Sequence, residues 1–223
     1  MNIQLVVLDM AGTTVYDGDA VHRCLADALA AAGARVTREA INEVMGMPKP
    51  LAIAHLLRSH GREQTPAEPV HANFQRRMID YYRTDPAVHE TEGAAAVFEM
   101  LRARGIKVVL DTGFDRRITD VILARLGWRA GVIDGSVTSD EVQRGRPFPD
   151  MIQRAMALTG VADATRVAKV GDTPSDLEEG YAAGCALVIG VTSGSHTRTQ
   201  LERCRHTHLV ERLAELPDIF GIN

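Results

Sequence analysis

The sequence predicts an α/β fold with a Rossmann-like parallel sheet core, helices on both faces of the sheet, and an inserted all-α segment. Short aliphatic runs that stop at a Gly- or Asp-bearing turn are typical of strands buried on both faces. Longer segments with helical spacing lie between these runs. Strands that alternate with helices in this way are typical of a parallel sheet covered on both sides.

The individual elements follow from these two patterns. The predicted strands are residues 3–8, 106–110, 167–170 and 186–191. The predicted helices of the core are residues 93–104, 117–126, 150–159 and 176–183.

One segment breaks the alternation. From about Tyr16 to about Tyr82 the sequence contains only helical patterns, such as AVHRCLADALAAAG and PVHANFQRRMIDYYR. A segment of this length is too long for a single crossover between two strands, so we expect a small helical domain here. The predicted domains are therefore a core of residues 1–15 and 83–223 and a helical domain of residues 16–82, in which residues 61–69 join two helices.

Composition limits the possible partners and the compartment. The 223 residues are 45% hydrophobic and 24% charged, as in soluble globular proteins, and the net charge is -4 with no basic stripe. We therefore expect neither nucleic acid nor a membrane as partner. The start of the chain lacks the features of a signal peptide, so a cytoplasmic location is expected. Three widely separated cysteines, Cys24, Cys185 and Cys204, suggest neither a disulfide framework nor a zinc site.

Polar residues follow the predicted strands where each strand ends. Asp9 follows the first strand, Thr112 and Gly113 follow the second, and Asp172 follows the third with Asp176 a turn later. Arg146 lies just before a helix. Because ligands of open parallel sheets bind beyond the carboxyl ends of the strands, we expect these side chains to meet at one edge of the sheet.

Each of these groups can be given a physical role in phosphoryl chemistry. The carboxylates Asp9, Asp172 and Asp176 form a hard oxygen site of the kind that Mg²⁺ prefers. The cation of Arg146, the hydroxyl of Thr112 and backbone N–H groups around Ala11, Gly12 and Thr13 would neutralise a phosphoryl group. Asp9 could attack phosphorus and form an aspartyl-phosphate.

Four motifs in order, DMAGT, DTG, RGRP and KVGDTPSD, cover the chain from Asp9 to Asp176, and together they resemble the haloacid dehalogenase superfamily of phosphotransferases. The helical insertion matches the cap domain that many members carry after the first strand. Most phosphatases of this superfamily have an aspartate where this chain has Ala11, and use it as general acid and base. Ala11 can offer only its backbone carbonyl, as a ligand to the metal.

The form D-x-A-G-T-T resembles one branch of the superfamily, phosphonoacetaldehyde hydrolase. In that family a cap lysine condenses with the substrate aldehyde, and the imine accepts the electrons released when the C–P bond breaks. The segment MGMPK places Lys49 at the corresponding position, and the resemblance implies a homodimer formed through the cap. Met45 and Gly113 are further candidate substrate-binding residues. A C–P bond has no leaving oxygen to protonate, so Ala11 and Lys49 are consistent with each other.

Other interpretations of these residues stay open at this point. The branch usually has a histidine three residues after its lysine, where this chain has Ala52. Lys49, between two prolines, could be a solvated surface charge, Met45 could pack the cap, and Asp9 and Asp176 could cap helices. The histidines of the insertion, His22, His55 and His71, are expected to be solvated or packed rather than catalytic, and Asp17 to Asp19 are expected to form the hinge between core and cap.

Three functions are compatible with the sequence. The first is Mg²⁺-dependent C–P cleavage of phosphonoacetaldehyde or a related phosphonate, with Asp9, Lys49, Thr112 and Arg146 as catalytic residues. The second is hydrolysis of a small phosphate ester such as phosphoglycolate or a sugar phosphate. The third is a non-catalytic protein that binds a phosphorylated metabolite.

Overall fold

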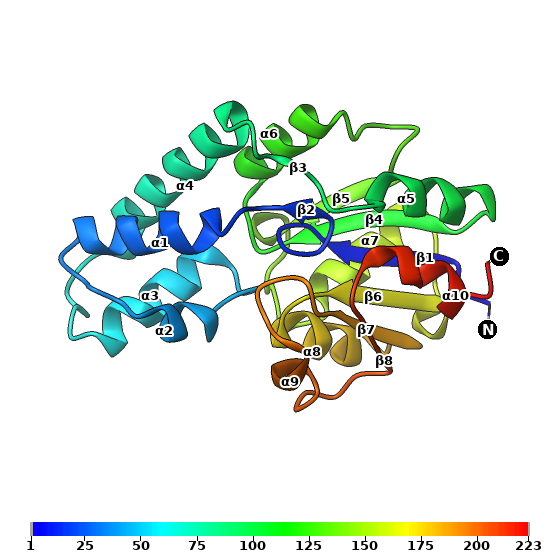
Figure 1. Cartoon of the computed structure of the whole chain (residues 1–223). Coiled ribbons are helices and arrows are strands. Elements are labelled where there is room, and N and C mark those ends of the chain that lie inside the picture. The colour runs from blue at the N-terminus through cyan, green and yellow to red at the C-terminus, as the bar shows by residue number, and fades with distance from the viewer. Residues whose placement is uncertain (1, 223) are drawn as a thin grey trace.

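A six-stranded parallel sheet forms the centre of the computed structural model, which describes residues 2–222 (Figure 1). The strands lie in the order β5-β4-β1-β6-β7-β8. Their bounds are β1 Leu5–Asp9, β4 Lys107–Thr112, β5 Gly135–Thr138, β6 Val167–Gly171, β7 Leu187–Val191 and β8 His208–Val210. The chain builds β4 and β5 on one side of β1 and then β6 to β8 on the other. The order therefore reverses beside β1, which places Asp9 at the switch point where such folds bind ligands.

The four strands predicted from the sequence are confirmed as β1, β4, β6 and β7. Two further strands, β5 and β8, were missed. β5 has the sequence GSVT and β8 has the sequence HLV, and both lie at the edges of the sheet. Edge strands are partly exposed and short, so they lack the continuous aliphatic run by which the inner strands were found.

Helices cover both faces of the sheet, as expected from the buried strands. α7 (Asp150–Thr159), α8 (Pro174–Ala183) and α9 (Arg198–Leu201) pack on one face. α5 (Ala94–Ala103), α6 (Arg116–Leu126) and α10 (Leu216–Ile219) contribute to the core on the other side. Short 3-10 helices complete the core: η1 Ser139–Glu141, η2 Ala164–Arg166 and η3 Leu213–Glu215.

The strands alternate between the two faces. In β1, Leu5 and Val7 belong to the apolar cluster under α7 and α8, whereas Val6 and Leu8 belong to the cluster on the opposite face. Because side chains of a strand alternate with a period of two, Asp9 continues the row of Leu5 and Val7. The carboxylate of Asp9 therefore belongs to the α7–α8 side of the sheet.

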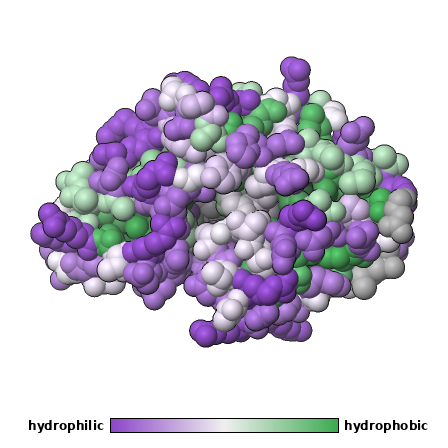
Figure 2. All heavy atoms as spheres, in the orientation of Figure 1, coloured by the Kyte–Doolittle hydropathy of each residue, from purple (hydrophilic) through white to green (hydrophobic). Residues whose placement is uncertain are grey.

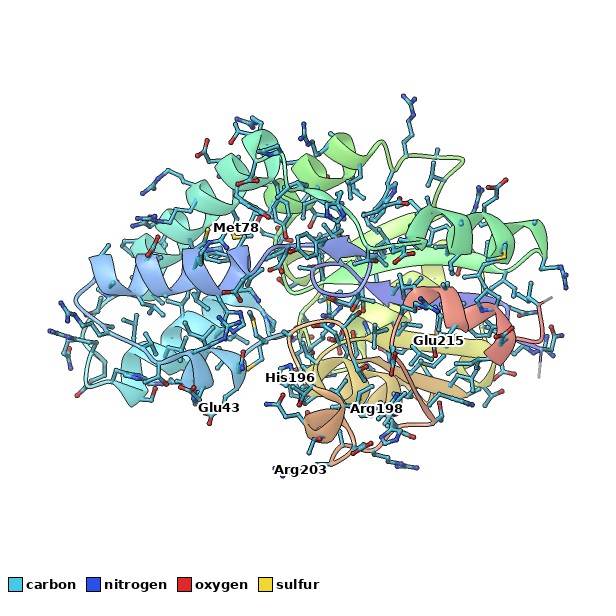
Figure 3. All side chains as sticks on the ribbon, viewed as in Figure 1. Glu43, Met78, His196, Arg198, Arg203 and Glu215 are labelled. Carbon is cyan, nitrogen blue, oxygen red and sulfur yellow. The ribbon has the colours of Figure 1, made fainter. Side chains whose placement is uncertain are left out.

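Four consecutive helices lie beside the carboxyl ends of the strands (Figure 1). They are α1 (Ala20–Ala31), α2 (Arg38–Asn42), α3 (Lys49–Ser59) and α4 (Ala67–Thr84), and residues 20–84 are called the helical segment below. Figure 3 shows Met78 of α4 on the side toward α1, where it is fully buried. The apolar interior of the segment is continuous with the apolar cluster on one face of the sheet.

A short antiparallel ribbon connects the helical segment to the sheet. β2 (Val15–Tyr16) pairs with β3 (His89–Glu90), so the chain leaves and re-enters the core through neighbouring strands. α4 runs on to Thr84, past the predicted boundary at residue 82, and this domain division stays a prediction. Polar residues cover most of the face seen in Figure 2, with apolar residues scattered among them. Over residues 2–222, no helix has both the length and the apolar character needed to cross a bilayer.

Candidate active site

A cavity of about 380 Å³ lies between the helical segment and the carboxyl ends of the strands. Eight of the residues singled out from the sequence line it: Asp9, Ala11, Gly12, Met45, Lys49, Thr112, Gly113 and Arg146. Thr13, Asp172 and Asp176 are buried behind the cavity wall. Thr13 bonds to Asp172, Asp172 also bonds to Ser195, and Asp176 bonds to Thr173. Ser195 and Thr173 both line the cavity. The structure therefore gathers the expected residues, although they come from distant parts of the chain.

Asp9 ends strand β1 and is 4% exposed. Its Oδ1 accepts a hydrogen bond from Nη1 of Arg146 at 2.6 Å. Burial raises the pKa of Asp9 to about 8, Arg146 opposes this, and repulsion from Asp176 and Asp172 adds to it. The alternative role of Asp9 as a helix cap is wrong, because no helix follows β1. An additional positive charge at this point would keep Asp9 ionised.

The turn after β1 uses its amides differently from the prediction. The N–H groups of Gly12 and Thr13 donate to the carbonyls of Val15 and Met10 at 2.9 and 3.2 Å, so they close the turn and do not face a phosphoryl group. Gly12 has a φ of 93°, and a Cβ there would lie 2.5 Å from Oδ2 of Asp172. Glycine is therefore required at this position for both backbone conformation and close approach.

Asp172, at the end of β6, is held by neutral donors. Its carboxylate accepts from the amide and hydroxyl of Ser195 at 2.6 and 2.7 Å and from the hydroxyl of Thr13 at 3.1 Å. Within residues 2–222, Asp172 forms no ion pair with a basic side chain. Burial and repulsion from Asp176 raise the pKa of Asp172 to about 6.

Asp176 is the third residue of α8. The N-cap of this helix is Thr173, whose hydroxyl donates to Asp176 Oδ2 at 2.5 Å, while its amide donates to the same oxygen at 3.2 Å. Asp176 is therefore the acidic partner in a capping box and not the cap itself. Its other oxygen lies 3.0 Å from Arg146 and 3.1 Å from Lys169.

Two sets of carboxylates compete as a metal site. Oxygens of Asp9, Asp111 and Asp176 lie within 4.8 Å of one another. Asp111, however, is already neutralised: burial alone would raise its pKa, but Arg146 and Lys169 hold it at about 2. The surplus negative charge is on Asp9 and Asp172, whose pKa values are raised. Among the described residues, oxygens of Asp9 and Asp176 form a group with Asp111 and not with Asp172, so the predicted ligand set of Asp9, Asp172 and Asp176 stays a prediction.

Arg146 is the most heavily paired side chain of the site. It is 1% exposed, and its guanidinium contacts four acids, namely Asp9, Asp111, Asp176 and Glu179, at 2.5 to 3.0 Å. Sequence reasoning missed Lys169 and Glu179, which complete this network. The signal was present in the strand VAKVG, since a lysine in the middle of a strand buried on both faces needs acidic partners.

Lys49 opens α3 and is 4% exposed, so its interpretation as a solvated surface charge is wrong. Its Nζ donates to the carbonyl of Met47 at 3.3 Å and lies 5.5 Å from the centre of the Phe114 ring. Burial lowers the pKa of Lys49 to about 8, with Asp9 opposing and Arg146 adding to the shift. Lys49 is therefore partly neutral near neutral pH, as an amine nucleophile must be.

The residues before Lys49 pack tightly on the core. A Cβ at Gly113 would lie 2.6 Å from the carbonyl oxygen of Met47, and the amide of Lys49 donates to the carbonyl of Gly113 at 3.3 Å. Gly113 is thus needed so that the segment carrying Lys49 can approach β4. Met45 is buried and also lines the cavity, so its role in substrate binding stays a prediction.

The three histidines of the helical segment differ in position. His55 is exposed and lies outside the cavity wall. His22 is buried in that wall, between Asn42 and Asp19. His71 lies 3.6 Å from Asp115. His196 of the loop after β7, labelled in Figure 3, hydrogen-bonds to the backbone of Asn42 at the end of α2, so the core contacts the helical segment there.

Comparisons with known proteins identify the family of the chain. The family model of the haloacid dehalogenase-like hydrolases matches residues 3–184. A phosphonoacetaldehyde hydrolase from Bacteroides fragilis is 30% identical, with 96% of this chain and 87% of that protein covered. One from Bacillus cereus is 29% identical, with 100% and 90% covered.

Solved structures share the fold. A phosphonoacetaldehyde hydrolase-like protein from Oleispira antarctica is 21% identical, with 99% of this chain and 92% of that chain covered and a TM-score of 0.82. A variant of CbbY from Rhodobacter sphaeroides in complex with xylulose-1,5-bisphosphate is 20% identical, with 96% of each chain covered and a TM-score of 0.81. The motifs, the sheet and the family match lead to one conclusion: the chain belongs to the haloacid dehalogenase-like hydrolases.

Proposed function

We propose that this hydrolase cleaves the C–P bond of phosphonoacetaldehyde or a closely related phosphonate aldehyde, with Mg²⁺ as cofactor and Lys49 as the residue that forms an imine. The single observation that carries the proposal is the buried Lys49, with its pKa lowered to about 8, in the wall of the cavity that also holds Asp9 and Arg146. The helical segment acts as the cap that closes the cavity, with the β2–β3 ribbon as its hinge.

The metal site is assigned to Asp9, the backbone carbonyl of Ala11, Asp172 and Asp176. A bound Mg²⁺ would supply positive charge that keeps the carboxylates ionised and neutralises the phosphoryl oxygens. The raised pKa values of Asp9 and Asp172 support this assignment, because burial and repulsion between the carboxylates cause them and a bound cation would offset both.

The chemistry of the chain's own residues follows in order. The neutral amine of Lys49 adds to the aldehyde carbon, and loss of water with uptake of one proton gives the protonated imine. Asp9 attacks phosphorus, the C–P bond breaks, and its electron pair moves into the imine to give an enamine. Protonation and hydrolysis of the enamine release acetaldehyde and restore Lys49, and water hydrolyses the aspartyl-phosphate. Arg146 and the Thr112 hydroxyl stabilise the phosphoryl oxygens during transfer.

Ala11 is compatible with this sequence of steps. A phosphate ester needs a proton on its leaving oxygen, which an aspartate at position 11 would provide. A C–P bond places its electrons on carbon, and the imine of Lys49 accepts them. The pairing of Ala11 with a buried Lys49 therefore favours a phosphonate over an ester.

The alternative is hydrolysis of a small phosphate ester. It is favoured by one observation, a structure of the same fold with a bound sugar bisphosphate. This alternative leaves the burial of Lys49 without a function and requires water or another residue to protonate the leaving oxygen.

Borohydride trapping separates the two functions. The chain has only three lysines, Lys49, Lys107 and Lys169, so peptide mass spectrometry assigns an adduct directly. We expect reduction with phosphonoacetaldehyde to leave one adduct, on Lys49, and the Lys107→Ala control to be trapped like the natural protein. Turnover of esters without any adduct on Lys49 would refute C–P cleavage.

A further inference from the structure

Beneath the cavity lies a fully buried group of charges that the proposed mechanism does not use. We propose that Asp111, Lys169 and Glu179 form a frame that positions the guanidinium of Arg146 against Asp9. They are positioning residues: Asp111 and Glu179 contact Arg146 directly, and Lys169 acts through its ion pairs with Asp111, Asp176 and Glu179. The inference rests on the proposed function in one respect only, that Asp9 receives a phosphoryl group.

The guanidinium is held from two sides. Its Nε donates to Glu179 Oε2 at 3.0 Å, and its Nη2 donates to Asp111 Oδ1 at 2.5 Å. The remaining nitrogen, Nη1, donates to Asp9 at 2.6 Å. Because the guanidinium is planar and rigid, fixing two of its nitrogens fixes the direction of the third. A lysine at position 146 has a single nitrogen and cannot be held in this way.

Lys169 joins the two acids of the frame, because it pairs with both Asp111 and Glu179. Its Nζ lies 2.5 and 2.6 Å from the two oxygens of Asp111 and 3.1 Å from Glu179. Without it, the acids around Arg146 would share a single cation. Lys169, Asp111 and Glu179 are each 0% exposed, so their charges are screened little by water.

The register of the sheet places these groups. Asp9 pairs with Asp111 across β1 and β4, and Val7 pairs with Lys169 across β1 and β6. All of these side chains lie on the α7–α8 face of the sheet. Lys169 is level with Val7, which is two residues before Asp9 in β1. Helix α8 adds Glu179 from above the sheet. The frame is therefore built from rigid elements, as precise positioning requires.

A purely structural role is the rival explanation. Burying an ion network rarely adds to stability compared with apolar packing, so its presence next to the nucleophile needs another reason. A structural role predicts that replacing the frame changes the melting temperature alone. A positioning role predicts weaker binding of a phosphoryl group and slower transfer in a protein that is still folded.

The test uses Glu179→Gln, which keeps the size of the side chain, and the charge-balanced pair Lys169→Met with Glu179→Gln. Inorganic phosphate with Mg²⁺ is the probe, measured by calorimetry, and melting is followed by circular dichroism. We expect folded variants with phosphate affinity reduced about tenfold or more. On p-nitrophenyl phosphate, whose leaving group departs without a proton, kcat should be reduced more than KM is raised. Lys107→Met, a lysine paired with Asp134 at the other end of β4, is the control and keeps the phosphate affinity.

Arg146→Lys completes a double-mutant cycle. If Glu179 acts through the guanidinium, its replacement has a smaller effect on phosphate affinity when residue 146 is lysine. Folded variants with natural phosphate affinity, additive effects in the cycle, or failure of both frame variants to fold would each overturn the inference. A protein that binds phosphate through this frame but does not cleave phosphonoacetaldehyde would refute the proposed function alone.

Discussion

Lys49 and Lys169 are both buried, yet their environments shift their pKa values in opposite directions. Lys169 has Asp111, Asp176 and Glu179 within 3.1 Å, and these acids raise its pKa above the ordinary value although burial lowers it. Lys49 has a backbone carbonyl and an aromatic ring near its amine, and burial lowers its pKa to about 8. The neighbouring acids, and not burial alone, therefore decide whether a buried lysine is a fixed charge or can be a nucleophile.

The two lysines also belong to different halves of the site. Lys169 lies in strand β6 and is held by ion pairs with Asp111, Asp176 and Glu179. Lys49 lies at the start of α3 in the helical segment and faces the cavity. In the proposed function, group transfer to Asp9 therefore belongs to the core, while the amine that forms the imine belongs to the helical segment.

The largest effect is expected for replacement of Lys49. Lys49→Ala removes the imine and should reduce cleavage of phosphonoacetaldehyde by at least about 10⁴-fold, because no other amine can accept the electrons. Phosphate binding to the core should stay within about twofold of the natural protein, since the core half of the site is unchanged. Kinetics of acetaldehyde release and calorimetry with phosphate measure the two halves separately. A Lys49→Ala enzyme that still cleaves the phosphonate would mean that Lys49 is not the electron sink.

Stability should show the opposite ranking of the two lysines. Lys169→Met leaves buried carboxylates without their cation and should lower the free energy of unfolding by about 3–5 kcal/mol. Lys49→Met breaks no ion pair and should change it by less than about 1 kcal/mol. Urea denaturation at pH 7 compares the two variants directly. Equal losses would mean that the acids around Lys169 do not need its charge.

The pH dependence of borohydride trapping should also differ between Lys49 and Lys169. Only neutral Lys49 adds to an aldehyde, so the rate of borohydride trapping should rise with pH through a midpoint at about 8, while Lys169 stays unmodified. The pKa of Lys49 is lower in the folded chain than its ordinary 10.5, so the unfolded chain binds more protons between about 8 and 10.5. The contribution of Lys49 to stability therefore increases with pH across that window. Trapping that is independent of pH between 6 and 9 would contradict the lowered pKa.

The sequence predicts the sheet and the approach of Asp9, Thr112, Arg146 and Asp172 because these depend on local patterns. Buried strands are aliphatic, and the end of each strand faces the same edge. The frame around Arg146 depends on register between distant strands, which no local pattern contains. Lys169 was passed over because one lysine in VAKVG does not interrupt an aliphatic run enough to change the prediction of a strand.

Burial of Lys49 was equally out of reach of the sequence. The segment MGMPK predicts a turn between helices, and turns are usually exposed. Gly113 lets the carbonyl of Met47 approach β4, and this contact between residues far apart in the chain removes Lys49 from water. A tertiary contact of this kind is visible only once the helical segment is placed against the core.

The smallest expected effect concerns the aromatic neighbour of Lys49. The face of Phe114 attracts an ammonium group by about 0.5–1 kcal/mol, so Phe114→Leu should lower the pKa of Lys49 by a few tenths of a unit. The midpoint of borohydride trapping should move to lower pH by that amount. Phe114 also packs edge-on against Tyr82, and Tyr82→Phe serves as the control, because it removes only a hydroxyl from the same apolar cluster and keeps the Phe114 ring. A shift to higher pH in Phe114→Leu would mean that the ring acts on Lys49 mainly by excluding water, since a smaller side chain would then let water stabilise the ammonium.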